Sequence, residues 1–387
     1  MKRSQRLSSV TSYPFSRWGK NIEPARRRGL DIIRLDIGNP DLKPPDEVIE
    51  ALFQSARHPE RHGYPGYHGL PAFREAVAAY YQRRFGVSLD PETEVLPLIG
   101  SKEGIVNLAL ACLDPGDLVL VPDPGYAPYT IGAALAGAET RAFPLLPEED
   151  FLPCLDSIPG AAADRAVMMW LNYPNNPTGA TVDLAFFERA VRFAREHSLL
   201  LCHDAPYCDV TFDGYVAPSA LQIPDAKEVA VEFNSLSKTW NMAGWRIGVA
   251  VGNADALAAL DQLKSNVDTG IFRPLQDAAI QALSVDPAWI AARNEIYHER
   301  VEIVLAGFAA AGIQALRPRA TLYIWAKVPT DDTSESFALR LLQETGVALA
   351  PGSFFGPGGE GYLRLSVTAP TTKIQEATDR IRRFVAP

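Results

Sequence analysis

Short apolar runs alternate with longer amphipathic stretches through the middle of the chain. The runs have the length and β-branched content of buried strands, and most are followed by apolar residues at helical spacing. This recurring order predicts an α/β fold with a mostly parallel central sheet and helices on both faces. The expected strands are 95–99, 117–122, 165–171, 199–202, 229–233 and 247–251, and the expected helices among them are 105–112, 130–136 and 184–197.

The pattern changes in the last quarter of the chain. There we expect a long helix at 287–311, a strand at 322–327, a helix at 334–344 and a strand at 361–367. This order is typical of a smaller α+β domain, which the N-terminal arm is expected to join. We therefore predict a large domain at 47–279 and a small domain made of 1–46 and 280–387.

The N-terminal arm is basic and rich in serine. Before the first acidic residue, Glu23, it carries only positive charges, at Lys2, Arg3, Arg6, Arg17 and Lys20. Such a composition occurs in transit peptides, but Pro14 and Gly19 are expected to interrupt a long amphipathic helix. We expect a plain basic arm, then a short strand at 34–38 and a helix at 47–56 with Asp46 as its N-cap.

Composition narrows the class of protein. The 387 residues are 47% hydrophobic and 21% charged, as in soluble globular proteins. A net charge of −9 argues against a nucleic-acid-binding role. No apolar run reaches the ~18 residues of a membrane-spanning helix. The cysteines lack C-x-x-C spacing and His62 and His68 lack a metal-ligand spacing partner, so we expect a cytoplasmic protein without a disulfide framework or a metal site.

A lysine follows the apolar run at 229–233, between small hydroxyl residues. Ser235, Ser237 and Lys238 are expected to lie in a loop, with Arg246 just before the next strand. Burial lowers the pKa of an amine, and a neutral amine can attack a carbonyl to form a Schiff base. Hydroxyl groups and an arginine at the ends of strands can also form a pocket that binds an anion. A solvated lysine in a polar loop is the simpler alternative.

Other polar clusters also follow strands, at the edge where open α/β sheets bind ligands. Gly100 and Ser101 open a helix and can bind an anion there, although Ser101 could equally be a simple N-cap. Tyr126, after a Pro-Gly pair, could stack on a flat ring. Asp204 ends an apolar strand and either needs a positive partner or caps a helix.

In combination these motifs resemble the fold-type I enzymes that use pyridoxal 5′-phosphate (PLP), specifically the class I/II aminotransferases. The resemblance extends from about Tyr13 to the end of the chain. It rests on the run Asn172-Tyr173-Pro174-Asn175-Asn176-Pro177-Thr178-Gly179, on Asp204 and Tyr207, on Ser235-x-Ser237-Lys238, and on Arg246 and Arg364. Within the family the chain is most similar to LL-diaminopimelate aminotransferases, through 97–104, 121–126, 203–205 and 361–366.

The resemblance implies a role for each matching residue. Lys238 would hold PLP covalently and shuttle a proton, and Asp204 would pair with the pyridine N1–H. Tyr207 and Asn176 would bind the O3′ oxygen, and Tyr126 would stack on the ring. The implied phosphate ligands are Ser101, Lys102, Ser235, Ser237 and Arg246, with Tyr64 reaching across from the second subunit of a homodimer.

The resemblance also implies how the substrate binds. Arg364 would take the α-carboxylate as a bidentate pair, assisted by Asn176 and the backbone of Gly38. Gly38 could otherwise be an ordinary turn glycine.

The substrate itself stays open at this stage. Amino transfer from LL-diaminopimelate to 2-oxoglutarate is one hypothesis, and transfer from aspartate, alanine or another common amino acid is the alternative. Pro206, where a small residue is more usual, weakens the assignment to one substrate. A third hypothesis keeps the same fold but changes the reaction to that of a lyase or a decarboxylase. A regulatory role is disfavoured because only about 30 residues precede the first strand, too few for a DNA-binding module.

Overall fold

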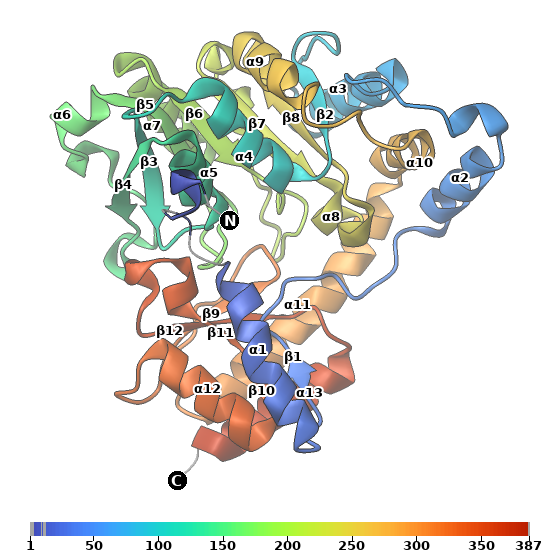
Figure 1. Cartoon of the computed structure of the whole chain (residues 1–387). Coiled ribbons are helices and arrows are strands. Elements are labelled where there is room, and N and C mark those ends of the chain that lie inside the picture. The colour runs from blue at the N-terminus through green and yellow to red at the C-terminus, as the bar shows by residue number, and fades with distance from the viewer. Residues whose placement is uncertain (1–3, 9, 11–12, 386–387) are drawn as a thin grey trace.

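The structure is a computed structural model that describes residues 4–8, 10 and 13–385. Figure 1 shows a large sheet flanked by helices and, below it, a smaller group of strands and helices. The long helix α11 (Pro287–Ala310) runs from the first toward the second. No helix in these described ranges is both long and apolar enough to span a bilayer.

The large sheet has the strand order β2-β8-β7-β6-β5-β3-β4. Strand β8 is antiparallel to both of its neighbours, and the other neighbouring strands run parallel. The sheet is therefore mostly parallel, as predicted. Its strands are β2 (Val95–Leu98), β3 (Leu118–Asp123), β4 (Glu139–Pro144), β5 (Ala166–Leu171), β6 (Leu200–Asp204), β7 (Ala230–Ser235) and β8 (Gly248–Gly252).

Helices cover both faces of this sheet. One apolar cluster joins alternate strand residues such as Val231 and Phe233 to α4 (Ser101–Cys112), α5 (Pro128–Ala136) and α9 (Ala254–Lys264). The opposite face packs on α3 (Pro71–Phe85) and α7 (Leu184–Glu196). Successive side chains of a strand point to opposite faces of the sheet. Since helices cover both faces, both sets of strand side chains are buried, and this explains why the strand sequences are almost continuously apolar.

The smaller group contains an antiparallel sheet of order β11-β12-β9 and a parallel pair in which Ile33 of β1 lies opposite Val347 of β10. The N-terminal segment thus joins the C-terminal part of the chain. The strands are β1 (Ile33–Arg34), β9 (Tyr323–Lys327), β10 (Val347–Ala348), β11 (Ala350–Pro351) and β12 (Tyr362–Ser366). The remaining helices are α1 (Pro14–Arg27), α2 (Asp46–Ala56), α6 (Gly160–Ala163), α8 (Leu236–Thr239), α10 (Arg273–Leu283), α12 (Ser334–Thr345) and α13 (Thr371–Val385).

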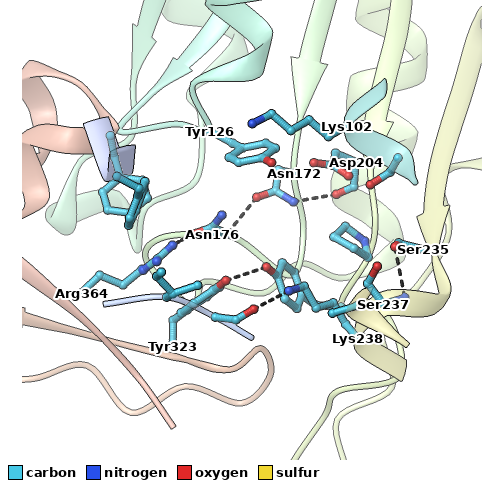
Figure 2. Close-up of a pocket in the computed structure, with 18 of the residues that line it drawn as sticks. Lys102, Tyr126, Asn172, Asn176, Asp204, Ser235, Ser237, Lys238, Tyr323 and Arg364 are labelled. Carbon is cyan, nitrogen blue, oxygen red and sulfur yellow. Dashed lines mark hydrogen bonds between the residues drawn. The ribbon is translucent and has the colours of Figure 1, made fainter. Parts of the chain in front are cut away.

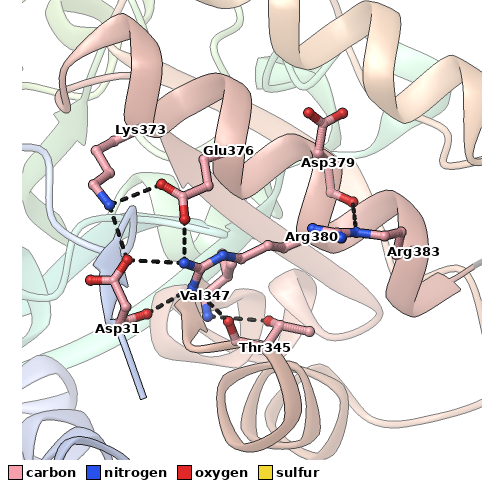
Figure 3. A network of polar contacts seen from close by, with 8 residues as sticks. All are labelled: Asp31, Thr345, Val347, Lys373, Glu376, Asp379, Arg380 and Arg383. Carbon is pink, nitrogen blue, oxygen red and sulfur yellow. Dashed lines mark hydrogen bonds and ion pairs between the residues drawn. The ribbon is translucent and has the colours of Figure 1, made fainter. Parts of the chain in front are cut away.

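A polar network fastens the segment just before β1 to α13 (Figure 3). Arg380 Nη1 donates to the carbonyl oxygens of Asp31 and Thr345, each at 2.8 Å, and Arg380 Nη2 donates to Asp31 Oδ2 at 2.9 Å. Lys373 Nζ adds a contact to Asp31 Oδ2 at 3.0 Å. One arginine therefore connects the N-terminal segment, the end of α12 and the C-terminal helix.

The N-terminal arm differs from our prediction, because it contains a helix that Pro14 and Gly19 do not interrupt. A helix, α1, begins at Pro14 and continues through Gly19, because proline at the first helical position loses no intrahelical hydrogen bond. Its buried residues include Trp18 and Ile22, so packing outweighs the cost of glycine. Lys2 and Arg3 lie outside the described residues.

Two expected helix starts also differ. Asp46 is the first residue of α2 and makes no capping hydrogen bond, since Pro45 occupies the N-cap position. Ser101 likewise opens α4 as its first residue, with Gly100 before it. Lys238, expected in a loop, lies in the single-turn helix α8, where the Ser235 hydroxyl accepts a hydrogen bond from the Ser237 amide.

Candidate active site

A cavity of about 320 Å³ lies between the carboxyl ends of the large sheet's strands and the smaller group. Its lining includes twelve of the thirteen residues that the sequence singled out, all except Tyr64. Figure 2 shows how several of them converge on one space. The predicted residues in the lining are Gly38, Ser101, Lys102, Tyr126, Asn176, Asp204, Tyr207, Ser235, Ser237, Lys238, Arg246 and Arg364.

Lys238 brings an amine to the centre of this cavity (Figure 2). Its Nζ donates to the carbonyl oxygen of Gly38, and its own carbonyl oxygen accepts from Arg293 Nη1 at 2.7 Å. Burial lowers the pKa of Lys238, and the positive charges of Arg364 and Arg246 lower it further, while Tyr323 opposes them. A lysine held in this way loses its proton more readily than one in water, as a nucleophilic amine requires.

Asp204 ends β6 and is buried under the cavity. Its Oδ2 accepts a hydrogen bond from the Tyr129 hydroxyl at 2.8 Å, whereas Oδ1 has no partner among the described residues. Burial raises the pKa of Asp204 to about 6, although the Tyr129 hydrogen bond and the charges of His203 and Lys238 act in the opposite direction. A buried carboxylate oxygen without a donor indicates that a donor, such as a protonated ring nitrogen, belongs there.

An anion cradle occupies one end of the cavity. Gly100 has φ +79°, and a Cβ there would lie 2.3 Å from Arg246 Nη2, so only glycine lets the guanidinium approach the start of α4. Ser101 and Ser237 line the same region. Burial, together with the charge of Arg246, lowers the pKa of Lys102. Two cations and the amino end of α4 form a site suited to a phosphate.

Arg364 brings a second cationic site to the other end. It is only 3% exposed, and it donates to Asn176 Oδ1 and to the Asp36 carbonyl oxygen, both at 2.7 Å. Both acceptors are neutral, and its Nε has no partner in the part of the chain that the structure describes. Because a buried cation without a carboxylate is costly, we infer that Arg364 binds an anionic ligand.

Aromatic and amide side chains complete the walls between these two ends. The ring of Tyr126 lies beside the cavity (Figure 2). It meets the Tyr129 ring edge-on, with centroids 5.7 Å apart. Asn172 Nδ2 donates to the Asp204 carbonyl oxygen at 2.6 Å, and its Oδ1 accepts from the Asn176 amide at 2.8 Å. These bonds fix the loop after β5 against the end of β6.

Sequence reasoning missed several residues of the site. Tyr323 lies inside β9, and its hydroxyl is 2.9 Å from the Tyr207 hydroxyl. Tyr129, which contacts Asp204, is buried within α5. Arg293 lies on α11, remote in sequence from Lys238. Tyr323 and Arg293 lie within a strand and a helix, not in the polar clusters that follow strands. Tyr129 follows the strand predicted at 117–122, but nothing in the sequence indicates its contact with Asp204.

Tyr64 is the exception among the predicted residues. It is 83% exposed and lies outside the cavity, where its carbonyl oxygen accepts from Arg273 Nη2 at 2.9 Å. Its predicted role requires a second subunit, so it stays a prediction.

A family model for aminotransferases of class I and II matches residues 30–381. The chain belongs to this family. The LL-diaminopimelate aminotransferase of Moorella thermoacetica is 50% identical over 385 residues, covering 100% of this chain and 99% of that protein. The LL-diaminopimelate aminotransferase of Syntrophobacter fumaroxidans is 46% identical over 99% of this chain and 98% of its own length.

Solved structures agree with the fold of this aminotransferase. BacF of Bacillus subtilis has a TM-score of 0.96 at 38% identity, covering 100% of this chain and 99% of that one. A single mutant of the aspartate aminotransferase of Thermus thermophilus has a TM-score of 0.93 at 31% identity over 100% of both chains. The predicted fold is therefore confirmed, and the aminotransferase is a PLP-dependent transferase.

The cavity fits this cofactor. The unpartnered Oδ1 of Asp204 offers an acceptor for a pyridine N–H, and the cradle at Gly100, Ser101 and Arg246 offers cations and hydroxyls for a phosphate. The amine of Lys238 lies in the same space for a covalent link to an aldehyde.

Proposed function

We propose that this aminotransferase transfers the amino group of LL-diaminopimelate to 2-oxoglutarate. The reaction type is carried by one observation: a buried arginine without a carboxylate partner, Arg364, shares a cavity with the amine of Lys238 and the carboxylate of Asp204. The choice of donor is supported by relatives of that name that are 46–50% identical over essentially their whole length.

We propose the following roles for the residues of the cavity. When bound, PLP supplies an electron sink for the carbanion at the substrate's Cα. Lys238 would hold the cofactor and, once its Nζ is released as a free amine, that Nζ would remove the proton from Cα, while Asp204 would accept a hydrogen bond from the ring N1–H. Tyr207 and Asn176 bind O3′, and the Tyr126 ring stacks on the cofactor. The proposed phosphate ligands are Ser101, Lys102, Ser235, Ser237, Arg246 and Tyr64 of the partner subunit.

Arg364 orients the substrate in this scheme. Its planar guanidinium takes the α-carboxylate in a bidentate pair, with Asn176 and the Gly38 backbone beside it. The rings of Tyr323, Phe355 and Phe15 lie 4.0, 4.7 and 5.2 Å from its central carbon, and they leave it few other orientations. The neutral acceptors on Arg364 leave its charge uncompensated until a substrate arrives.

A homodimer with shared sites and the two-domain division at 46/47 and 279/280 belong to the same proposal. A homodimer is supported by exposed apolar side chains that a second copy of the chain could cover, namely those of Phe53, Tyr64, Tyr67, Val267 and Phe272. Four free cysteines support a cytoplasmic location.

A donor panel tests the substrate. Purified enzyme is mixed with LL-diaminopimelate, its meso isomer, aspartate or alanine, and conversion of the bound cofactor to its aminated form is followed by absorbance. We expect LL-diaminopimelate to react with the highest kcat/KM. If aspartate or alanine reacts and LL-diaminopimelate does not, the substrate assignment is wrong. Product analysis must find a keto acid together with the aminated cofactor, since a lyase or decarboxylase would not leave the amino group on the cofactor.

A matched pair of variants tests the reaction type. Lys238→Ala is expected to lose the visible absorbance of covalently bound PLP and to lower turnover by at least ~10²–10⁴-fold, the usual contribution of a general base. Lys20→Ala, which removes an exposed amine from α1, is expected to leave both unchanged. Unchanged turnover in Lys238→Ala would contradict the proposal.

A further inference from the structure

Behind Asp204, on the other face of β6, lies a buried histidine that the proposed chemistry does not use. His203 precedes Asp204 in the strand, so its side chain points to the opposite face of the sheet. Its Nδ1 lies 2.8 Å from Glu232 Oε2, and its Nε2 lies 2.9 Å from the carbonyl oxygen of Tyr173. A carbonyl oxygen can only accept a hydrogen bond, so Nε2 carries a proton.

The other ring nitrogen faces a carboxylate that already receives several hydrogen bonds. Glu232 Oε1 accepts from the Tyr81 hydroxyl at 2.9 Å, and Oε2 accepts from the Ser219 hydroxyl at 2.8 Å and from the Ala220 amide at 3.1 Å. An ionised carboxylate accommodates all of these donors and a protonated Nδ1 as well, so the arrangement suits an ion pair between Glu232 and an imidazolium at His203.

Among the described residues, Glu232 is the only carboxylate that is hydrogen-bonded to His203. Glu232 is its cross-strand neighbour on β7, and Tyr81 of α3 reaches the pair only through Glu232. The apolar ring of Phe187, on α7, lies 4.7 Å from the imidazole centroid. Asp204 is the carboxylate next to His203 on its own strand, and the positive charge of His203 lowers the pKa of Asp204 against the larger effect of burial, which raises it.

We propose that His203, held as an imidazolium by Glu232, is a positioning residue that keeps the Asp204 carboxylate ionised so that it can accept a hydrogen bond from the ring nitrogen of the cofactor. The inference rests on the proposed role of Asp204. In a purely structural role, the His203–Glu232 pair would only fasten β6 to β7. In the proposed role, the affinity for the cofactor also depends on the charge of His203, on the far side of the sheet.

The protonation of His203 can be measured directly. In protein labelled with ¹⁵N-histidine, both ring nitrogens of His203 are expected to carry protons near neutral pH, with the resonance assigned by its absence in His203→Gln. A single protonated nitrogen would overturn the inference, and this measurement needs neither bound cofactor nor turnover.

The electrostatic effect is measured by cofactor binding to the full-length apo protein. Pyridoxamine 5′-phosphate is the probe because it binds without a covalent link, and its 1-deaza analogue, which lacks the ring nitrogen, is the matched control. In His203→Gln and Glu232→Gln the pKa of Asp204 is expected to rise. Pyridoxamine phosphate should then bind up to about tenfold more weakly below about pH 6, as for a one-unit pKa change, and the loss should shrink at higher pH as Asp204 ionises.

Two comparisons separate the possible outcomes. Tyr81→Phe removes a neutral hydrogen bond from the same carboxylate, so it is expected to weaken folding without changing the preference for pyridoxamine phosphate over its deaza analogue. If the wild-type protein discriminates between the two ligands and the His203 and Glu232 variants discriminate equally well, only this inference is overturned. If the wild-type protein binds both ligands equally, the role of Asp204 itself is wrong and the inference fails with it.

Discussion

The hydroxyl of Tyr323 lies 2.9 Å from the hydroxyl of Tyr207, and the ring of Tyr323 lies 4.0 Å from the guanidinium carbon of Arg364. Burial raises the pKa of Tyr323, but the positive charges of Arg364 and Lys238 and the hydrogen bond with Tyr207 together outweigh burial, and the net shift is downward. One side chain from β9 therefore contacts the proposed cofactor ligand, Tyr207, and the proposed substrate ligand, Arg364.

We predict that Tyr323→Phe lowers kcat/KM about threefold to tenfold, because it removes one hydrogen bond worth ~0.5–1.5 kcal/mol while keeping the ring under Arg364. Tyr362→Phe, on the neighbouring strand and outside the cavity lining, is the matched control and should behave as wild type. An unchanged kcat/KM in Tyr323→Phe would show that the Tyr207 contact is not needed for turnover.

Replacement of Arg364 tests the carboxylate site. Arg364→Lys keeps the charge but loses the planar, bidentate geometry, so kcat/KM for the amino donor is expected to fall about 10- to 100-fold, as for a lost charged hydrogen bond of ~1.5–3 kcal/mol. The visible spectrum of bound PLP should not change. Arg317→Lys, in an exposed ion pair with Glu302, should leave kcat/KM unaltered. A changed spectrum with normal kinetics would contradict the role of Arg364.

The raised pKa of Asp204 predicts a pH effect on cofactor binding. Asp204 is ionised above its folded pKa of about 6 and protonated below it. The apo protein is therefore expected to bind pyridoxamine phosphate well above about pH 6, with affinity falling as the pH drops through that value. Titrations of wild type and Asp204→Asn across this range should differ only on the alkaline side. Parallel curves would show that Asp204 does not contact the ring nitrogen.

Subunit mixing tests whether Tyr64 acts across an interface. In the proposed homodimer, the Lys238→Ala and Tyr64→Ala variants are both expected to be impaired, the second through weaker binding of the phosphate that Tyr64 is proposed to contact. Unfolding and refolding the two variants together should restore activity, since one of the two sites in a mixed dimer then contains both native residues. Tyr67→Ala in place of Tyr64→Ala controls for the loss of an exposed ring from the same loop. Activity that does not rise on mixing would place Tyr64 and Lys238 in the same subunit's site or in different sites.

The network around Arg380 gives a prediction about stability (Figure 3). Arg380→Ala removes hydrogen bonds to the Asp31 and Thr345 carbonyl oxygens, so we expect the free energy of unfolding to fall by about 1–3 kcal/mol. Arg382→Ala removes a single exposed ion pair with Asp379 from the same helix and should cost less than ~1 kcal/mol. Urea midpoints of the two apo variants would show the difference, and equal midpoints would contradict it.

Much of the site could be predicted because its residues follow strands. Lys238, Asp204 and Asn176 all lie at the end of a strand or a few residues after it, and parallel strands bring such positions to one edge of a sheet. The motifs also determined the family. The functional roles of these residues remain predictions.

The rest could not be predicted because it depends on tertiary packing. Strand β4 was missed because its residues, Glu139–Pro144, are mostly exposed and show no apolar run. Helix α1 was missed because Pro14 and Gly19 are unfavourable within a helix, and only the burial of Trp18 reveals the compensation. Tyr323 was missed because the sequence pattern identifies a tyrosine within a strand as a core residue, whether or not its hydroxyl reaches a cavity.

The contact between Arg364 and the Asp36 carbonyl oxygen joins residues 328 positions apart in the chain. During synthesis on the ribosome, β1 has no strand partner until Val347 has emerged, and Arg364 follows still later. A nascent chain can therefore assemble the parallel sheet and the amine of Lys238 well before it can position a substrate. With the role proposed for Arg364, the competence to bind an amino acid is thus acquired only when the last part of the chain has been translated.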